Sequence, residues 1–479
     1  MHGFKDTLLH VVLKVCFMKS RNLKRVGLLI IAFFFVSNVN AESIPLVQKN
    51  RPDTIDLSVR RAKRNATDSV ANKRAGRLTF GGYGEATYKY SFYSDNAFRY
   101  SFADRYANSK GFGQVDIPHV VLMLGYDFGK GWSMGTEIEF EHGGTEVAVE
   151  IESEETGEYE QEIERGGEVA LEQFWLQKSF LDNKLNIRLG HIVVPVGATN
   201  SHHLPTEFFN VFRPEGENTI IPCTWHETGI SVWGQVGGWR YEFQLLPALN
   251  STMFNVQGWA HDASASPYEF RVANKIAGAF RVDNTSVNGL RLSLSGYVGN
   301  TFNNDIVTEE NSTTYKDVKG TVVYGSFDFQ YKHKWLVLRG NYDYGYLGDA
   351  ALISRYNNYL PNSSSAPYPH TLVGRSVMDG AFEAGFNLLP ERKERKLYLF
   401  ARYEYYDSYN PAYVISNGER VPLSDFKWTE RHVFSAGLNY YPIPYIAIKG
   451  EFGYRMLAKQ YNSEPWVAVG ICYSAFFKR

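Results

Sequence analysis

Charged residues that alternate with apolar residues are the part of this sequence best suited to chemistry. Side chains two residues apart share one face of a β-strand, so each alternating run would present its charges on a single surface. Fixed charges along a water-filled passage select permeating ions and orient polar solutes. The residues that we expect to line such a passage and its constriction are Glu137, Glu139, Arg188, Arg213, Glu215, Glu217, Glu227, Arg240 and Arg291. The same charges could equally be solvated residues without a selective role, because any wide water-filled interior is polar.

Histidines and glutamates in the middle of the chain raise the question of a metal site. The residues concerned are His202, His203, His226, Glu215, Glu217 and Glu227. Their spacing matches no standard zinc pattern, so we predict no metal site. A dense acidic run between residues 143 and 167 could bind calcium or bridge lipopolysaccharide through divalent cations. A solvated surface hairpin turning at Thr156-Gly157 is the favoured interpretation of this run.

Catalysis receives little support from the sequence. It contains no Gly-rich phosphate loop, no Gly-x-Ser-x-Gly elbow and no His-Glu-x-x-His helix. We therefore expect neither an enzyme nor a cofactor. An outer-membrane lipase-like barrel stays open as an alternative, because separate strands could build a Ser–His site. The balance of 50 basic against 51 acidic residues argues against a nucleic-acid binder.

The elements that would position these charges are β-hairpins. The clearest one turns at Gly129-Lys130-Gly131, with alternating apolar residues before the turn and Glu137, Glu139 and Glu141 alternating after it. Period-two alternation around a glycine turn is typical of a hairpin. Further hairpins are predicted at 168–194, 227–247, 273–299, 320–346, 376–407 and 430–456, with an opening strand near 78–89 and a closing strand near 465–477. The total is about sixteen strands, an even number within the range of bacterial outer-membrane barrels.

The connections between these strands are alternately tight and long. The long ones cover roughly 90–113, 143–167, 195–225, 248–272, 300–319, 347–375, 408–429 and 457–464. Short periplasmic turns and long outer loops are typical of an outer-membrane barrel. Aromatic residues lie beside the tight turns, where a girdle at one membrane interface would place them: Phe128, Trp132, Phe180, Trp239, Trp335, Tyr440, Tyr441 and Tyr445. We predict an all-β, transmembrane antiparallel barrel over residues 77–479, in contact with outer-membrane lipid and lipopolysaccharide.

The N-terminal region is predicted to be an export signal. Basic residues from Lys19 to Arg25 precede an apolar run, Val26 to Val36, and a small-residue cleavage pattern ends at Ala41. We assign residues 1–41 to a signal peptide, with Met18 as the expected true start, and 42–76 to a polar periplasmic leader. After Ala41 no stretch approaches the ~18 apolar residues of a membrane-spanning helix. A membrane anchor is the less favoured interpretation of the apolar run.

One region resembles a known family. The strand end Gly190-His191-Ile192-Val193-Val194-Pro195-Val196-Gly197 and the following loop, through Phe208, Arg213-Pro214, Ile221-Pro222, Trp225 and Glu227-Thr228-Gly229, resemble the phosphate-selective porin O and P family, which includes Bacteroidetes-type outer-membrane porins. The resemblance implies a sixteen-stranded, usually trimeric channel whose long third loop folds into the barrel. Phosphate capture in that family relies on clustered lysines and arginines. Between Pro195 and Trp225 this chain has Arg213 alone, so phosphate selectivity is not expected to carry over.

These observations predict an outer-membrane porin for passive diffusion of small polar solutes or ions, with residues 195–225 folded inward and a homotrimer as the expected assembly. A secreted carbohydrate-binding β-protein is the alternative from another class, although its apolar strand faces would leave large exposed patches. A disulfide between Cys223 and Cys472 was weighed, because disulfides persist outside the cytoplasm. Two separate thiols are favoured.

Overall fold

The computed structural model describes residues 77–478, apart from 153–159, 266–269, 305, 307–312, 314, 359, 361–369, 393 and 417–418. The chain divides into two units, Met1–Pro52 and Asp53–Arg479, and every described residue belongs to the second, which is described here by itself. The signal peptide and the polar leader predicted for residues 1–76 lie outside the described residues, and so does the turn predicted at Thr156-Gly157.

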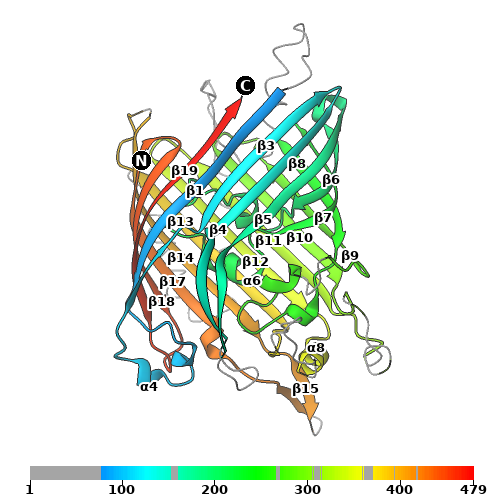
Figure 1. Cartoon of the computed structure of the whole chain (residues 1–479), viewed down its shortest axis with the longest axis vertical. Coiled ribbons are helices and arrows are strands. Elements are labelled where there is room, and N and C mark those ends of the chain that lie inside the picture. The colour runs from blue at the N-terminus through cyan, green and yellow to red at the C-terminus, as the bar shows by residue number, and fades with distance from the viewer. Residues whose placement is uncertain are drawn as a thin grey trace, which may run out of the picture. The chain divides into compact units, whose positions relative to one another are not determined.

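Long antiparallel strands form the wall of the structure (Figure 1). They are β1 (Arg77–Ser91), β2 (Phe112–Asp116), β3 (His119–Gly129), β4 (Trp132–Glu152), β5 (Glu160–Phe180), β6 (Leu185–Val193), β7 (His226–Val236), β8 (Trp239–Pro247), β9 (Ile276–Asn284), β10 (Leu290–Asn300), β11 (Thr321–Lys332), β12 (Leu336–Leu347), β13 (Ser376–Asn387), β14 (Lys396–Asn410), β17 (Glu430–Ile443), β18 (Ile446–Met456) and β19 (Glu464–Lys478). A separate short hairpin pairs β15 (Tyr413–Ser416) with β16 (Glu419–Pro422).

Helices are short and lie in the long connections. They are η1 (Ala97–Arg99), α4 (Ala103–Tyr106), α5 (Ala198–Ser201), α6 (Glu215–Ile220), η3 (Ser251–Met253), η4 (His261–Ser264), α8 (Ala350–Asn357) and η5 (Lys427–Thr429), whereas η2 (Leu181–Asn183) forms a tight turn. In the described part of the chain, no helix has the length and apolar character needed to span a membrane.

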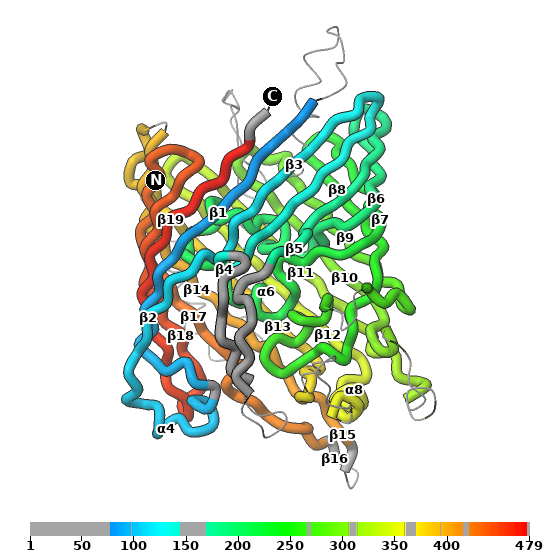
Figure 2. Tube along the Cα trace, viewed as in Figure 1, coloured from blue at the N-terminus to red at the C-terminus, as the bar shows by residue number. Residues whose placement is uncertain are grey.

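The sheet closes on itself. Each wall strand pairs antiparallel with its neighbour in the chain, and β19 pairs with β1 from Thr79↔Lys478 to Ser91↔Trp466. Strands β2 and β3 both pair with β1 and form one wall strand, interrupted at Ile117-Pro118 because proline has no N–H to donate to the ladder. The predicted barrel of about sixteen antiparallel strands is therefore confirmed. Figure 2 shows the first and last described strands side by side.

Tight turns join the strands at one end, and the long connections lie at the other (Figure 1). The predicted hairpins agree with this arrangement, but the predicted loop over 143–167 is wrong. Strands β4 and β5 continue through it, with pairs from Glu146↔Gly166 to Glu152↔Glu160. Val147, Val149 and Ile151 alternate with other residues there, which favours strands despite the acidic composition.

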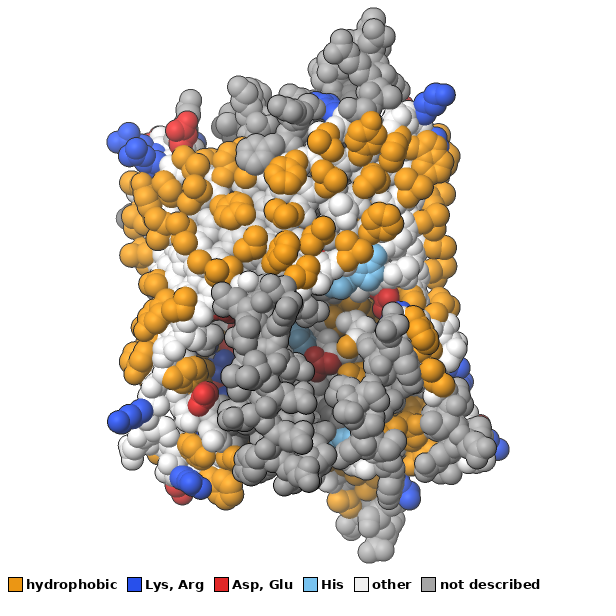
Figure 3. Space-filling model, viewed as in Figure 1, with side chains coloured by type: hydrophobic (Ala, Val, Ile, Leu, Met, Phe, Trp, Pro, Cys, Tyr) orange, Lys and Arg blue, Asp and Glu red, His pale blue; other side chains and the backbone are white. Residues whose placement is uncertain are grey.

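Apolar side chains cover the outer face of the wall (Figure 3). Exposed examples from different strands are Leu122, Phe174, Leu189, Phe243, Leu294, Phe382, Leu438 and Ile471. Of the predicted girdle, Phe128, Trp132, Phe180, Trp239, Trp335 and Tyr445 are exposed beside the tight turns. Tyr441 was assigned to the girdle wrongly. It is buried against Tyr398 on the inner side, because the irregular pairing between Tyr440 and Ile443 shifts the alternation at this turn.

Candidate functional site

Residues 194–225, which we call the inner loop, connect β6 to β7 and contain α5 and α6. Pro195, Pro214 and Pro222 keep this segment out of the ladder, because proline supplies no donor. The loop is closed on itself by Glu217, whose carboxylate accepts from Ala198 N (2.7 Å), Thr199 N (2.6 Å) and Thr199 Oγ1 (2.6 Å). Burial raises the pKa of Glu217, and these three donors oppose that shift. Glu217 was predicted to line the constriction, whereas the structure buries it inside the loop.

The middle of the inner loop lies against strands β14, β17 and β18. Phe209 stacks on Phe400, with ring centroids 5.6 Å apart. Lys449 Nζ donates to the carbonyl oxygens of Phe208 (3.0 Å) and Asn210 (2.7 Å). Glu451 accepts from Val211 N at 2.9 Å. Because these wall side chains come from strands distant in sequence from β6 and β7, the loop crosses the interior rather than extending away from the barrel.

Arg213 brings the inner loop to an acidic part of the wall. Its guanidinium is buried, and its Nη2 lies 3.9 Å from Glu139 Oε1. Glu137 and Glu139 are both buried on the inner face of β4, next to Glu172 of β5. Of the residues predicted to line the constriction, Glu137, Glu139 and Arg213 are thus brought together.

Glu215 anchors the first turn of α6 to the opposite part of the wall. Its carboxylate pairs with Arg455, accepts from Tyr406 Oη at 2.9 Å and lies 3.9 Å from Arg431. Burial alone would raise the pKa of Glu215, but Arg455 and Arg431 outweigh burial and hold that pKa below its usual value. The carboxylate is therefore ionised at neutral pH and serves as a charged anchor of the loop.

The arginines of β8, β9 and β10 form a continuous network of ion pairs with carboxylates. Arg240 pairs with Glu242 and lies 3.5 Å from Asp283. Arg281 bridges Asp283 and Asp328, at 2.8 Å from each, and Arg291 reaches the other oxygen of Asp328 at 2.9 Å. Each of these guanidinium groups is compensated by a carboxylate, so this part of the wall is polar without being strongly basic.

Two predicted residues stand apart from these groups. Arg188 donates to Gln177 Oε1 from Nε and Nη2, both at 3.1 Å, and lies over the ring of Trp175. Glu227 pairs with Arg271 of the connection between β8 and β9 at 3.0 Å.

The six residues considered for a metal site are not assembled into one among the described residues. Glu215 and Glu217 serve as anchors, Glu227 pairs with Arg271, and His226 Nδ1 lies 2.6 Å from His191 Nε2. Burial, followed by Arg213, lowers the pKa of His203 to about 4, so its ring is neutral at pH 7. The thiols of Cys223 and Cys472 are both free.

A cavity of about 710 Å³ opens at the end of the barrel that carries the long connections. Its lining comes from four of those connections, including the inner loop, and from β17 and β18: Tyr93, Arg99, Tyr100, Ser101, Asn218, Thr219, Asn255, Gln257, Gly258, His261, Asp262, Trp428, Arg431 and Arg455. Tyr100 stacks on Trp428 with ring centroids 5.0 Å apart. Apart from Arg455, these residues were not predicted as interior residues, because they lie outside the regular alternation or, like Arg431, at its edge.

Comparisons with known proteins identify the class of molecule. A family model described as "Carbohydrate-selective porin, OprB family" matches residues 130–447. An uncharacterized protein of Aquifex aeolicus (strain VF5) is 26% identical over 348 residues, covering 71% of this chain and 70% of that protein. Among solved structures, an anion-selective porin from Comamonas acidovorans is 13% identical (TM-score 0.46, 84% of this chain and 100% of that one), and the outer membrane channel DcaP of Acinetobacter baumannii is 12% identical (TM-score 0.45, 85% and 99%).

The family match decides between the predicted interpretations. Membership in the phosphate-selective porin O and P family is not confirmed, because the model that matches describes another porin family. The prediction of an outer-membrane porin for passive diffusion of solutes is confirmed. Neither the secreted carbohydrate-binding protein nor the lipase-like barrel gains support. Since the match spans more than half of the chain, this protein belongs to the carbohydrate-selective porin (OprB) family of the bacterial outer membrane.

Proposed function

We propose that the solutes passing through this porin are carbohydrates and that the cavity at its outer mouth receives them. The cavity, at about 710 Å³, lies within the size range of small-molecule sites. Its lining joins aromatic rings to amide, hydroxyl and guanidinium groups, which suits a neutral solute with apolar ring faces and many hydroxyl groups. This combination at the mouth is the observation that carries the proposal.

The compensated charges of the mouth favour a neutral solute over phosphate. Arg99 pairs with Glu464 at 2.7 Å, and Arg455 pairs with both Glu464 and Glu215. An anion would have to compete with these carboxylates, whereas a hydroxyl group can donate to a carboxylate and accept from a guanidinium.

We propose further that the inner loop narrows the passage. The contacts of Phe209 with Phe400, of Arg213 with the acidic wall and of Glu215 with Arg455 support this arrangement. Glu137, Glu139, Arg188, Arg240, Arg291 and Glu227 then act as wall charges above or around the constriction, while Glu217 shapes the loop.

The apolar outer belt is proposed to contact outer-membrane lipid, with lipopolysaccharide at the outer leaflet. A homotrimer and the absence of enzymatic activity stay predictions. Electrophoresis of the unheated, detergent-solubilised protein would distinguish a trimer from a monomer.

Block of ion current by an oligosaccharide tests the proposed mouth. Maltotriose added to the outer side of a planar bilayer should reduce the single-channel current of the wild-type porin. Trp428→Ala, which removes an aromatic ring from the cavity, should weaken this block several-fold. Trp335→Ala removes an exposed tryptophan beside a tight turn at the other end of the barrel and serves as the matched control. Equal block in the two variants would show that the cavity does not bind the sugar.

A further inference from the structure

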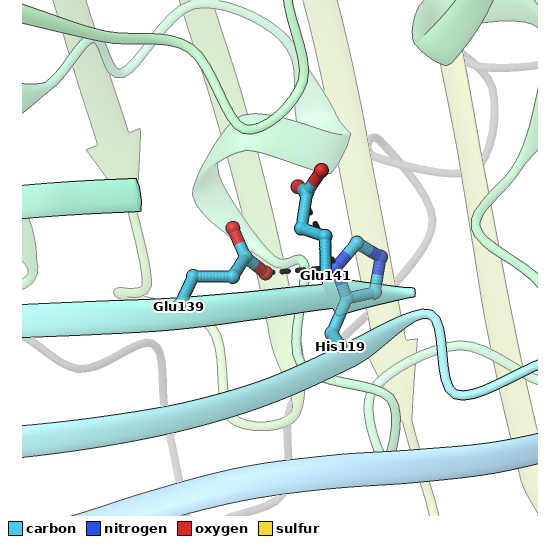
Figure 4. A group of neighbouring side chains, drawn as sticks. All are labelled: His119, Glu139 and Glu141. Carbon is cyan, nitrogen blue, oxygen red and sulfur yellow. Dashed lines mark ion pairs between the residues drawn. The ribbon is translucent and has the colours of Figure 1, made fainter. Parts of the chain in front are cut away.

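Three side chains with metal-binding groups project from one face of the β3–β4 hairpin (Figure 4). His119 faces Glu141 directly in the ladder, and Glu139 lies two residues before Glu141 on the same strand. His119 Nδ1 is 2.7 Å from Glu139 Oε1 and 4.0 Å from Glu141 Oε1. One potential ligand atom from each residue lies within 4.8 Å of the other two.

More carboxylates surround this group. Glu85 Oε1 lies 3.9 Å from His119 Nε2, and Glu137 and Glu172 adjoin Glu139 on the inner wall. Of Glu137, Glu139 and Glu172, only Glu139 has a guanidinium within 4.0 Å among the described residues, and that guanidinium belongs to Arg213. The negative charge here exceeds what Arg213 can compensate.

Glu172 provides an independent indication that a positive species is missing from this network. It occupies a β-bulge, because Glu137 pairs with Gln173 and Ile138 pairs with Leu171, so that Glu172 is left without a partner in the ladder. The bulge turns its side chain inward, where it is 1% exposed. Neither carboxylate oxygen has a hydrogen-bond donor, and the carboxylate lies against those of Glu139 and Glu137.

The hydroxyl group of Tyr83 points to the same conclusion from another strand. Tyr83 is fully buried on β1, its oxygen has no hydrogen-bond partner, and its strongest electrostatic neighbours are Glu172 and Glu139. Buried carboxylates without donors are rare, because losing their hydration is unfavourable unless a proton or a cation replaces it.

We propose that His119, Glu139 and Glu141 bind a divalent transition-metal cation of the Zn²⁺ class. One imidazole and two carboxylates form a ligand set suited to zinc, whereas Ca²⁺ and Mg²⁺ favour oxygen ligands alone. Glu172 supports the site from behind, because its carboxylate adjoins that of the ligand Glu139. The side chains of Glu141 and His119 are 30% and 16% exposed, so an ion from the surrounding water can reach them.

Titration calorimetry on the purified, folded porin tests this site. After treatment with EDTA and its removal, ZnCl₂ should bind with one ion per chain. His119→Ala and Glu141→Gln should each weaken the binding at least tenfold. His191→Asn is the matched control, because it disrupts the other close histidine pair, His191–His226, and should leave the affinity unchanged. Heat-modifiable electrophoretic mobility should show that each variant is folded.

Two further readouts separate the outcomes. Zn²⁺ should raise the thermal unfolding temperature of the wild type but not of His119→Ala, since a ligand stabilises only the state that binds it. Absence of zinc binding by the wild type would mean that protons neutralise the carboxylates, and would overturn the proposal. Loss of binding in His191→Asn, or calcium binding that is insensitive to His119→Ala, would overturn it as well.

Discussion

At the scale of single residues, the inner loop is held by charged groups that titrate. Glu215 is the clearest case, because Arg455 and Arg431 both favour its ionised form. Its folded-state pKa is below the value of about 4.5 for an unperturbed glutamate. The ion pair therefore stabilises the folded barrel above that pH, and this contribution is lost as the pH falls through the folded-state pKa.

Glu215→Gln should lower the free energy of unfolding at pH 7 by about 1–3 kcal/mol, less than for a fully buried pair because the carboxylate is partly exposed. At pH 3 the wild type and the variant should differ much less. Urea unfolding in detergent at both pH values measures the difference. Glu391→Gln, an exposed carboxylate in a tight turn, is the control. A difference that does not change with pH would contradict the role of the ion pair.

Gly82 tests the closure of the barrel at one position. A Cβ there would lie 2.2 Å from the carbonyl oxygen of Val121 on the neighbouring strand. Gly82→Ala should therefore destabilise the barrel by roughly 1–3 kcal/mol. Gly325→Ala is the matched control, because a Cβ at Gly325 would meet no atom within 4 Å. The folded fraction of each variant, measured by electrophoretic mobility without heating, should fall only for Gly82→Ala.

Alternation in the sequence could place Glu137 and Glu139 on the inner face, but it could not identify their partners. Arg213 approaches Glu139 from a loop more than seventy residues away in sequence. His119 could have been found from the turn at Gly129-Lys130-Gly131, since continuing the hairpin register opposes it to Glu141. Glu172 could not, because the bulge that turns it inward breaks the period of two.

At the scale of elements, the inner loop is the segment whose removal should matter most. Deleting residues 201–218 removes Phe209, Arg213 and Glu215 together with most of their contacts. We expect a higher single-channel conductance in planar bilayers, because the deleted segment crosses the interior. An unchanged conductance in a correctly folded variant would show that the loop does not restrict the passage.

Hairpins were predictable because tight turns and alternating strands are encoded locally. The tight turns of the described barrel follow glycine, asparagine or charged pairs visible in the sequence. The continuation of β4 and β5 through 143–167 was missed because its acidic composition indicated a solvated loop. The short helices of the long connections were missed because three to eight residues give too weak a period to recognise.

At the scale of the whole molecule, the alternation of tight and long connections predicted the barrel and its orientation. The pairing of β1 with β19 could not be read from any local pattern, since these strands lie at opposite ends of the described chain. The family was also misjudged from one loop, whereas the matching family model covers residues 130–447. Features that depend on many long-range contacts, such as the cavity at the mouth, need the folded structure.

Swelling of liposomes that contain the purified porin tests the central claim most directly. The vesicles are placed in isosmotic solutions of neutral sugars of increasing size, with protein-free vesicles and a heat-denatured sample as controls. We predict rapid swelling with monosaccharides and a rate that decreases with sugar size without any energy source. No swelling with any sugar, in vesicles through which the porin still conducts ions, would contradict a passive carbohydrate channel.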